Sequence, residues 1–277
     1  MTSPALQDIV ALFGCPAAGN PAQYLFERAI AAAGLDWRFF SVDVTPERLA
    51  PALAGAAAMG FRGCLLAGPL EEAAPAFLSR LTPAADFAGA ASLVEATAEG
   101  LLGHITEGRG IVEALRAHAG IAGARVLVAG AGVLGRATAL ELALGGAEAI
   151  IVAHRDPELA RSLAQKVAAI ESPVAVETLV SDGPFEVPEG VGLVVVARGA
   201  GEPCPRFERL RGDLILADTA LADQASPALL AGRAAGCCVI DGIEIHVEKT
   251  AIDFRTLTGM DADPDLLREA LEEFLSA

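Results

Sequence analysis

The sequence has few aromatic residues and no long uncharged hydrophobic run. Trp37 and Tyr24 are the only residues of their kinds. No run of about 18 uncharged apolar residues indicates a membrane-spanning helix. The residues after Met1 do not form a basic segment followed by an apolar one, which is the pattern of a secretory signal. We therefore expect a cytoplasmic protein that does not bind membranes.

Positive charge is also scarce. Lys and Arg number 20 against 36 for Asp and Glu, which gives a net charge of −16. This balance argues against nucleic acid or an anionic membrane as a partner. The five cysteines have no metal-ligand spacing, so no metal site is predicted. We expect a small-molecule substrate and a monomer or homodimer.

One stretch of the chain predicts a specific ligand. Residues 125–129 are rich in Val and Leu and lead into a Gly-x-Gly-x-x-Gly pattern, and a helical run and a second, apolar run follow. This order is typical of a strand–helix–strand unit that holds the pyrophosphate of a dinucleotide at the helix N-terminus. The predicted cofactor-binding residues of the loop are Gly130, Ala131, Gly132, Val133, Leu134 and Gly135.

The end of the second apolar run bears on the choice between NADP and NAD. An NAD site usually has an acidic residue there, but this chain has His154 followed by Arg155. An arginine can bind a 2′-phosphate through two parallel hydrogen bonds. Asp156 precedes Pro157 and matches a helix N-cap better than a ribose ligand. We predict NADP, with NAD still possible, and include His154 and Arg155 in the site.

Strand-like and helix-like segments alternate along most of the chain, which indicates an α/β fold with mostly parallel sheets. The pattern predicts a helix over residues 71–81, short strands over 91–95 and 101–105, and a terminal helix that begins at Asp263-Pro264. The position of the Gly-rich unit places the start of a Rossmann-type domain near residue 105.

Several landmarks together resemble the shikimate dehydrogenase family along nearly the whole chain. They include Gly60-Phe61-Arg62-Gly63, Gly68-Pro69, Gly103-His104-Ile105-Thr106-Glu107-Gly108, the Gly-rich loop and Asp241-Gly242-Ile243. The resemblance implies a substrate-binding domain over residues 1–104, completed by 243–277, and an NAD(P)-binding Rossmann domain over residues 105–242. It also implies a C-terminal helix that returns to the first domain, and NADP-dependent interconversion of shikimate and 3-dehydroshikimate.

The substrate residues depart from the family pattern. The family's Asn-Val-Thr-x-Pro-His-Lys aligns with residues 65–71, so Glu71 stands at the catalytic lysine and Leu65 and Ala67 replace Asn and Thr. The other aligned positions expected to contact substrate are Asn20, Ser92 and Thr106, with Glu107 in place of Asp and Lys249 in place of Gln. Relative to the family, a positive charge is lost at Glu71 and one is gained at Lys249, so the charges at the aligned site positions have changed together.

The change from Lys to Glu bears directly on the chemistry. A cation about 4 Å from the reacting oxygen contributes roughly 4 kcal/mol at an effective dielectric near 20, and an anion there would reverse the sign. The difference of up to about 8 kcal/mol corresponds to roughly five to six decades in rate. We therefore predict that shikimate is a poor substrate.

These observations leave three hypotheses. The first is an NADP-dependent oxidoreductase of shikimate dehydrogenase type that acts on another secondary alcohol or ketone, with Glu71, Glu107 and Lys249 as the catalytic residues. The second is a non-catalytic protein on the same fold that senses NADP(H) or binds a partner. The third is a shikimate or quinate dehydrogenase with a redistributed catalytic set.

Overall fold

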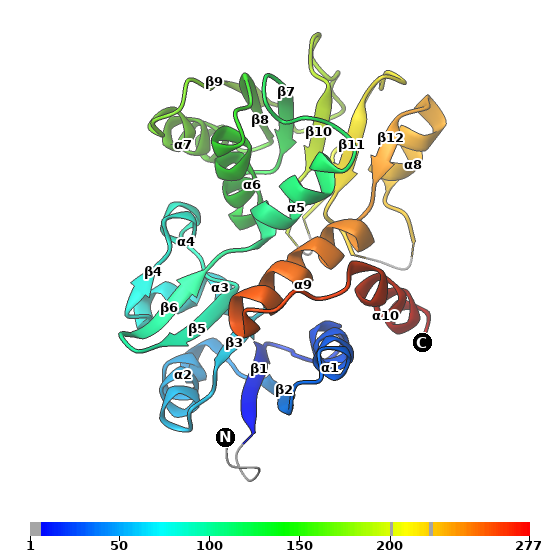
Figure 1. Ribbon diagram of the computed structural model, residues 1–277. Coiled ribbons are helices and arrows are strands. Elements are labelled where there is room, and N and C mark those ends of the chain that lie inside the picture. Colours follow the sequence, from blue (N-terminus) through cyan, green and yellow to red (C-terminus); the bar gives the residue numbers. More distant parts are fainter. Residues whose placement is uncertain (1–6, 200–201, 222–223) are drawn as a thin grey trace. The chain divides into compact units, whose positions relative to one another are not determined.

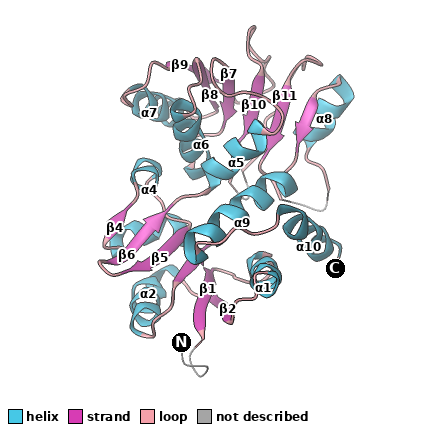
Figure 2. Ribbon diagram, viewed as in Figure 1, coloured by secondary structure: helices cyan, strands magenta, loops and turns pink. Residues whose placement is uncertain are grey.

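The computed structural model describes residues 7–199, 202–221 and 224–277. It divides the chain into two compact units, Met1–Thr106 with Lys249–Ala277, and Glu107–Glu248. Each unit has its own six-stranded sheet and its own hydrophobic core (Figures 1 and 2). The predicted boundaries at residues 104 and 242 lie a few residues from these divisions.

The first unit contains a mixed sheet in the order β2-β1-β3-β5-β6-β4. Among the strands of this sheet, only β5 runs antiparallel to its neighbours. The strands are β1 (Asp8–Gly14), β2 (Trp37–Asp43), β3 (Gly63–Leu66), β4 (Arg80–Leu81), β5 (Leu93–Thr97) and β6 (Gly100–His104). The helices are α1 (Ala22–Ala32), α2 (Leu49–Ala58), α3 (Leu70–Ala73), α4 (Pro83–Ala88) and α10 (Pro264–Ser276), with 3₁₀ turns at Pro46–Arg48 and Ala74–Phe77.

The second unit contains a parallel sheet in the order β12-β11-β10-β7-β8-β9. Its strands are β7 (Arg125–Ala129), β8 (Ala149–His154), β9 (Ala175–Val180), β10 (Leu193–Val196), β11 (Ile215–Asp218) and β12 (Cys238–Ile240). The helices are α5 (Glu107–Arg116), α6 (Val133–Leu144), α7 (Pro157–Ala168) and α8 (Pro227–Ala235), while α9 (Gly242–Thr258) begins here and ends in the first unit. From β7 the chain adds β8 and β9 on one side, and it then returns to the other side of β7 to add β10, β11 and β12. Proteins with such α/β sheets bind their ligands where the strand order reverses, here between β7 and β10.

The predicted helix over residues 71–81 is wrong. The α-helix ends at Ala73 and a 3₁₀ turn follows, because Pro75 has no N–H to donate to the carbonyl of Glu71. That carbonyl accepts instead from the backbone N–H of Ala91, at 2.9 Å. The chain then enters the sheet as β4, beside β6.

Helix α4 is not predicted by the sequence pattern, although its ends carry strong signals. Thr82 caps the N-terminus, with its Oγ1 accepting from the N–H of Ala85 at 3.3 Å, and Pro83 is the first helical residue. Gly89 ends the helix in the left-handed conformation, at φ 67°. These are the residues that favour helix ends, but the helix has only six residues and no long apolar period.

Replacing the cap should destabilise the first unit. We expect Thr82→Ala to lower the free energy of unfolding by about 1 kcal/mol, because the N–H of Ala85 loses its acceptor. Chemical denaturation followed by circular dichroism measures the change. Thr82→Ser, which keeps the hydroxyl, should retain most of the stability; an equal loss in both variants would contradict the capping role.

Candidate functional site

The Gly-rich loop connects β7 to α6 and leaves no space for side chains at two of its glycines. A Cβ on Gly130 would lie 1.9 Å from the carbonyl oxygen of Ala197, and φ there is 142°. A Cβ on Gly135 would lie 2.2 Å from the carbonyl oxygen of Gly130. Gly132 precedes α6 as its N-cap residue. The loop therefore presents the backbone N–H groups at the start of α6 to an approaching anion.

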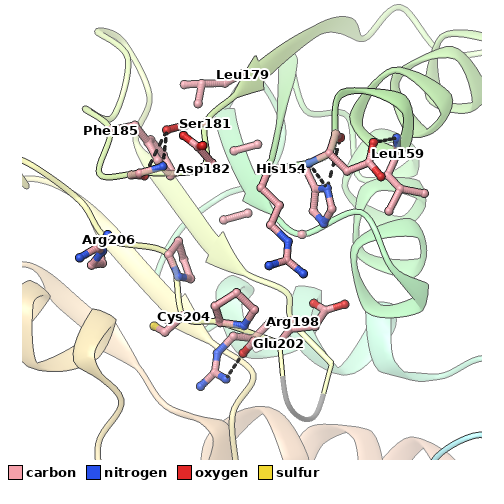
Figure 3. A pocket seen from close by; sticks show the side chains of 18 residues that line it. His154, Leu159, Leu179, Ser181, Asp182, Phe185, Arg198, Glu202, Cys204 and Arg206 are labelled. Carbon is pink, nitrogen blue, oxygen red and sulfur yellow. Dashed lines mark hydrogen bonds between the residues drawn. The ribbon is translucent and has the colours of Figure 1, made fainter.

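A cavity of about 440 Å³ opens beside this loop, at the carboxyl ends of β8, β9 and β10 (Figure 3). In the view of Figure 3, His154 and Leu159 lie on one side, Ser181 and Phe185 on another, and Arg198 and Cys204 on a third. The lining residues that carry charge are Arg155, Asp156, Asp182, Arg198, Glu202 and Arg206. The cavity belongs wholly to the second unit.

Local hydrogen bonds assign different roles to the three residues at the end of β8. The side chain of Asp156 caps α7, with Oδ1 accepting from the N–H groups of Glu158 at 2.8 Å and Leu159 at 3.4 Å. The Nδ1 atom of His154 lies 3.0 Å from the backbone nitrogen of Asp156, which orients the ring. Asp156 is thus engaged as a cap, as expected, while Arg155 is exposed and lines the cavity.

Arg198 lies at the end of β10 and has a partly unsatisfied guanidinium group. Its Nη1 donates to the carbonyl oxygen of Glu202 at 3.1 Å. Its buried Nε has no hydrogen-bond partner within the described part of the chain, and it lies 3.9 Å from Oδ1 of Asp218. Asp218 is itself fully buried and accepts from Ser226 at 2.5 Å. Arg198 therefore adds positive charge to the cavity wall.

The carboxylate of Glu202 lies close to the Gly-rich loop. Its Oε2 accepts from the N–H of Gly199 at 3.1 Å, and Oε1 is 3.5 Å from the position that a Cβ of Gly132 would occupy. A pyrophosphate that approached Gly132 would meet this negative charge. The side chain has to turn away, or share the space at an electrostatic cost, when a dinucleotide binds.

The first unit brings three of the predicted residues together around an aspartate that was not predicted. Asp253 on α9 is fully buried, and its Oδ1 accepts from Oγ1 of Thr106 at 2.6 Å. Its Oδ2 accepts from Nζ of Lys249 at 2.6 Å. The backbone N–H of Thr106 in turn donates to Oγ of Ser92 at 3.4 Å. A connected polar group therefore runs from Ser92 through Thr106 and Asp253 to Lys249.

The other predicted substrate and catalytic residues are Asn20, Glu71 and Glu107. Oδ1 of Asn20 accepts from the N–H of Ala22 at 2.9 Å, so its side chain helps to begin α1. Glu71 lies in the first turn of α3, and its carbonyl bonds the residue before Ser92. Glu107 begins α5 in the second unit. The joint action of Glu71, Glu107 and Lys249 stays a prediction.

Sequence reasoning missed Asp253, Arg198 and Arg206. A Lys and an Asp four residues apart on a helix usually form a solvent-exposed pair, so the spacing of Lys249 and Asp253 gave no sign of burial. Arg198 closely follows the apolar run of β10, and a charged residue at the carboxyl end of a buried strand was a usable signal. Arg206 lies in irregular chain, which no pattern predicts.

Within residues 7–199, 202–221 and 224–277, no cluster of His, Cys, Asp and Glu could hold a metal ion. In that same part of the chain, the helices are too short or too polar to cross a membrane. Burial raises the pKa of the Cys64 thiol to about 12, so it is not a nucleophile at neutral pH.

Removing the carboxylate beside the Gly-rich loop should strengthen dinucleotide binding. We expect Glu202→Ala to lower the Kd for NADPH about fivefold, because roughly 1 kcal/mol of repulsion with the pyrophosphate disappears. Fluorescence titration with NADPH measures it. Glu208→Ala, which removes a carboxylate that does not line the cavity, is the matched control; weaker binding by Glu202→Ala would show that the carboxylate holds the loop in its binding form.

Comparison with known proteins agrees with this geometry. A family model described as shikimate / quinate 5-dehydrogenase matches residues 113–181. The shikimate dehydrogenase (NADP(+)) of Moorella thermoacetica is 31% identical over 97% of this chain and 94% of its own length. Among solved structures, the 5-ketofructose reductase of Gluconobacter sp. strain CHM43 has a TM-score of 0.91 and 30% identity, with 97% of this chain and 99% of that chain covered.

The shikimate dehydrogenase of Thermus thermophilus, solved in complex with NADP(H) and shikimate, has a TM-score of 0.83 and 28% identity, with 97% of this chain and 100% of that chain covered. These similarities extend over both units. They confirm the predicted α/β fold with its Rossmann-type sheet and the resemblance that the sequence motifs indicated. The chain belongs to the shikimate dehydrogenase family.

Proposed function

We propose that this protein is an NADP-dependent oxidoreductase that interconverts a secondary alcohol and a ketone on an uncharged substrate. The observation that carries the proposal is the cavity with three arginines beside a Gly-rich loop in which Gly130 and Gly135 have no room for side chains. The relatives from Moorella thermoacetica and Thermus thermophilus, which are NADP(H) enzymes by name, support the same cofactor.

The cavity fits the adenosine end of NADP. The backbone N–H groups that begin α6 would hold the pyrophosphate, and Arg155 would pair with the 2′-phosphate through charge-assisted hydrogen bonds. Arg198 and Arg206 add positive charge to the same cavity. When bound, the nicotinamide supplies or accepts the hydride; the protein's own groups have to bind the substrate and move the proton.

The residues at the positions where the family binds its substrate favour an uncharged substrate. Leu65, at a position where the family has Asn, is buried on β3, and Ala67 follows at the position of Thr. The family pattern Ser-x-Ser-Pro, which holds the substrate carboxylate in that family, aligns with residues 18–21, so Ala18 and Asn20 replace its two serines. The side-chain carbonyl of Asn20 accepts from the N–H of Ala22. A buried carboxylate without such partners would lose its hydration and gain no replacement.

A structural relative supports the same conclusion. The Gluconobacter relative is a 5-ketofructose reductase, and 5-ketofructose is an uncharged sugar with ketone groups. The fold is therefore compatible with substrates other than shikimate. On this proposal Lys249 gives the proton to the carbonyl oxygen during reduction, and Ser92 and Thr106 help to bind the substrate. Glu71 and Glu107 complete the proposed catalytic set.

The selectivity for NADP should depend on Arg155. We expect Arg155→Leu to raise the Kd for NADPH roughly 10- to 100-fold and to change the Kd for NADH little, because only NADPH carries the 2′-phosphate. Fluorescence titration with both cofactors measures this ratio. Arg161→Leu removes an exposed arginine that is paired with Glu158 on α7 outside the cavity, and should leave both values unchanged. Equal weakening for NADPH and NADH in Arg155→Leu would contradict the proposed contact.

Substrate turnover tests the reaction. Coenzyme oxidation should be measured with 5-ketofructose and other uncharged hydroxy ketones, and coenzyme reduction with shikimate and quinate. We expect reduction of an uncharged ketone and a kcat/KM for shikimate at least ~10³-fold below that of the Thermus thermophilus enzyme assayed in parallel, since Glu71 replaces the family lysine.

Other outcomes would decide between the remaining hypotheses. Shikimate turnover at the rate of that control enzyme would overturn the proposed specificity and favour a redistributed catalytic set. Tight NADPH binding without turnover of any compound in the panel would favour a non-catalytic sensor. No NADPH binding would overturn the cofactor assignment as well.

A further inference from the structure

The buried carboxylate of Asp253 has a donor on each oxygen. Oγ1 of Thr106 donates to Oδ1 and Nζ of Lys249 donates to Oδ2, both at 2.6 Å. The side chain of Asp253 is fully buried, whereas that of Lys249 is 15% exposed. The side chain of Lys249 therefore lies between the buried carboxylate of Asp253 and the surface of the first unit.

Stability does not explain this arrangement. A Lys and an Asp at i and i+4 on a helix stabilise it only slightly in water, whereas removing a carboxylate from water costs far more. An exposed pair would provide the small gain without that cost. Arg255 of the same helix forms an exposed ion pair with Asp261, just beyond the helix end, with side chains 65% and 74% exposed. The burial of Asp253 requires another explanation.

The geometry fixes one position of the lysine. Asp253 is held by Thr106, and Thr106 is held by Ser92 through its backbone N–H, so the carboxylate cannot turn without breaking these bonds. Lys249 has a long flexible stem, which on an exposed surface would sample many rotamers. Bonding to a fixed carboxylate removes that freedom and holds the amine on the same polar group as Thr106 and Ser92.

We infer that Asp253 is a positioning residue that holds the protonated amine of Lys249 ready to give its proton to the carbonyl oxygen of the substrate. The inference rests on the proposed function. During reduction, bound NADPH would supply a hydride to the carbonyl carbon, the C=O π-electron pair would move to oxygen, and that oxygen would take the Nζ–H proton of Lys249. Ketone, NADPH and one proton become alcohol and NADP⁺. Lys249 is left as the neutral amine and regains its proton from water, while Asp253 stays ionised throughout.

Kinetics of single and double variants distinguish positioning from an independent effect. We expect Asp253→Asn to lower kcat ~10²-fold, with KM and the Kd for NADPH changed less than about threefold, because only proton transfer is impaired. Lys249→Gln should lower kcat more. Asp253→Asn added to Lys249→Gln should then have little further effect, since Asp253 acts through Lys249.

Arg255→Gln is the matched control, because it breaks the exposed ion pair at the end of the same helix and should leave kcat unchanged. If Asp253→Asn fails to fold, Thr106→Val removes one of the two donors to the carboxylate and should lower kcat in the same direction. An unchanged kcat in the folded variants, or the same factor of loss with and without Lys249, would overturn the inference.

A second readout does not depend on turnover. Acylation of Lys249 by an amine-reactive ester, followed by peptide mass spectrometry at one neutral pH, reports the fraction of neutral amine. Asp253→Asn should increase the labelling rate of Lys249 about tenfold, with that of Lys166 on α7 unchanged as an internal reference, because loss of the carboxylate favours the uncharged amine. No increase would overturn the positioning role even if no substrate is turned over. An increase without any turnover would leave the pairing supported and overturn the proposed function instead.

Discussion

The turn at the end of β7 is the constraint on which the cofactor site depends. Gly130 and Gly135 bring three backbone segments so close that a single Cβ would overlap a carbonyl oxygen. This packing places the start of α6 at the carboxyl edge of the parallel sheet, next to the arginine-lined cavity. Helix N-terminus, cavity and strand ends therefore converge because the chain has no side chains at these two positions.

The cofactor half could be predicted from the sequence because its signals are local. A Gly-rich turn needs particular backbone geometry, and a strand–helix–strand unit has a regular spacing. Short elements were harder. Helix α4 has a Thr-Pro start and a Gly end but too few residues to show a period, and the break in α3 depends on Pro75, whose missing N–H frees the carbonyl of Glu71 for Ala91. In short elements like these, a few hydrogen bonds at the ends decide the structure, and a sequence period has no room to develop.

The substrate half could not be predicted because its contacts join distant parts of the sequence. Thr106 and Asp253 are separated by 147 positions, and their bond defines the environment of Lys249. Alignment with the family identified Lys249 as a changed charge, but gave it no partner. The spacing of Lys249 and Asp253 is the same as that of a surface ion pair, and only burial in the folded unit distinguishes the two. Because Asp253 is buried, its bond to Lys249 holds the ammonium group in one position.

The chain is acidic overall, and its cofactor is also an anion, so the two repel each other. A net charge of −16 repels NADP(H) at long range, but in physiological salt this repulsion falls off over about 8 Å. Inside the cavity, Arg155, Arg198 and Arg206 act at shorter range and with less screening. Asp156, Asp182 and Glu202 line the same cavity and oppose them, with Glu202 at the Gly-rich loop. Binding strength then depends more on the balance of a few charges within the cavity than on the net charge of the chain.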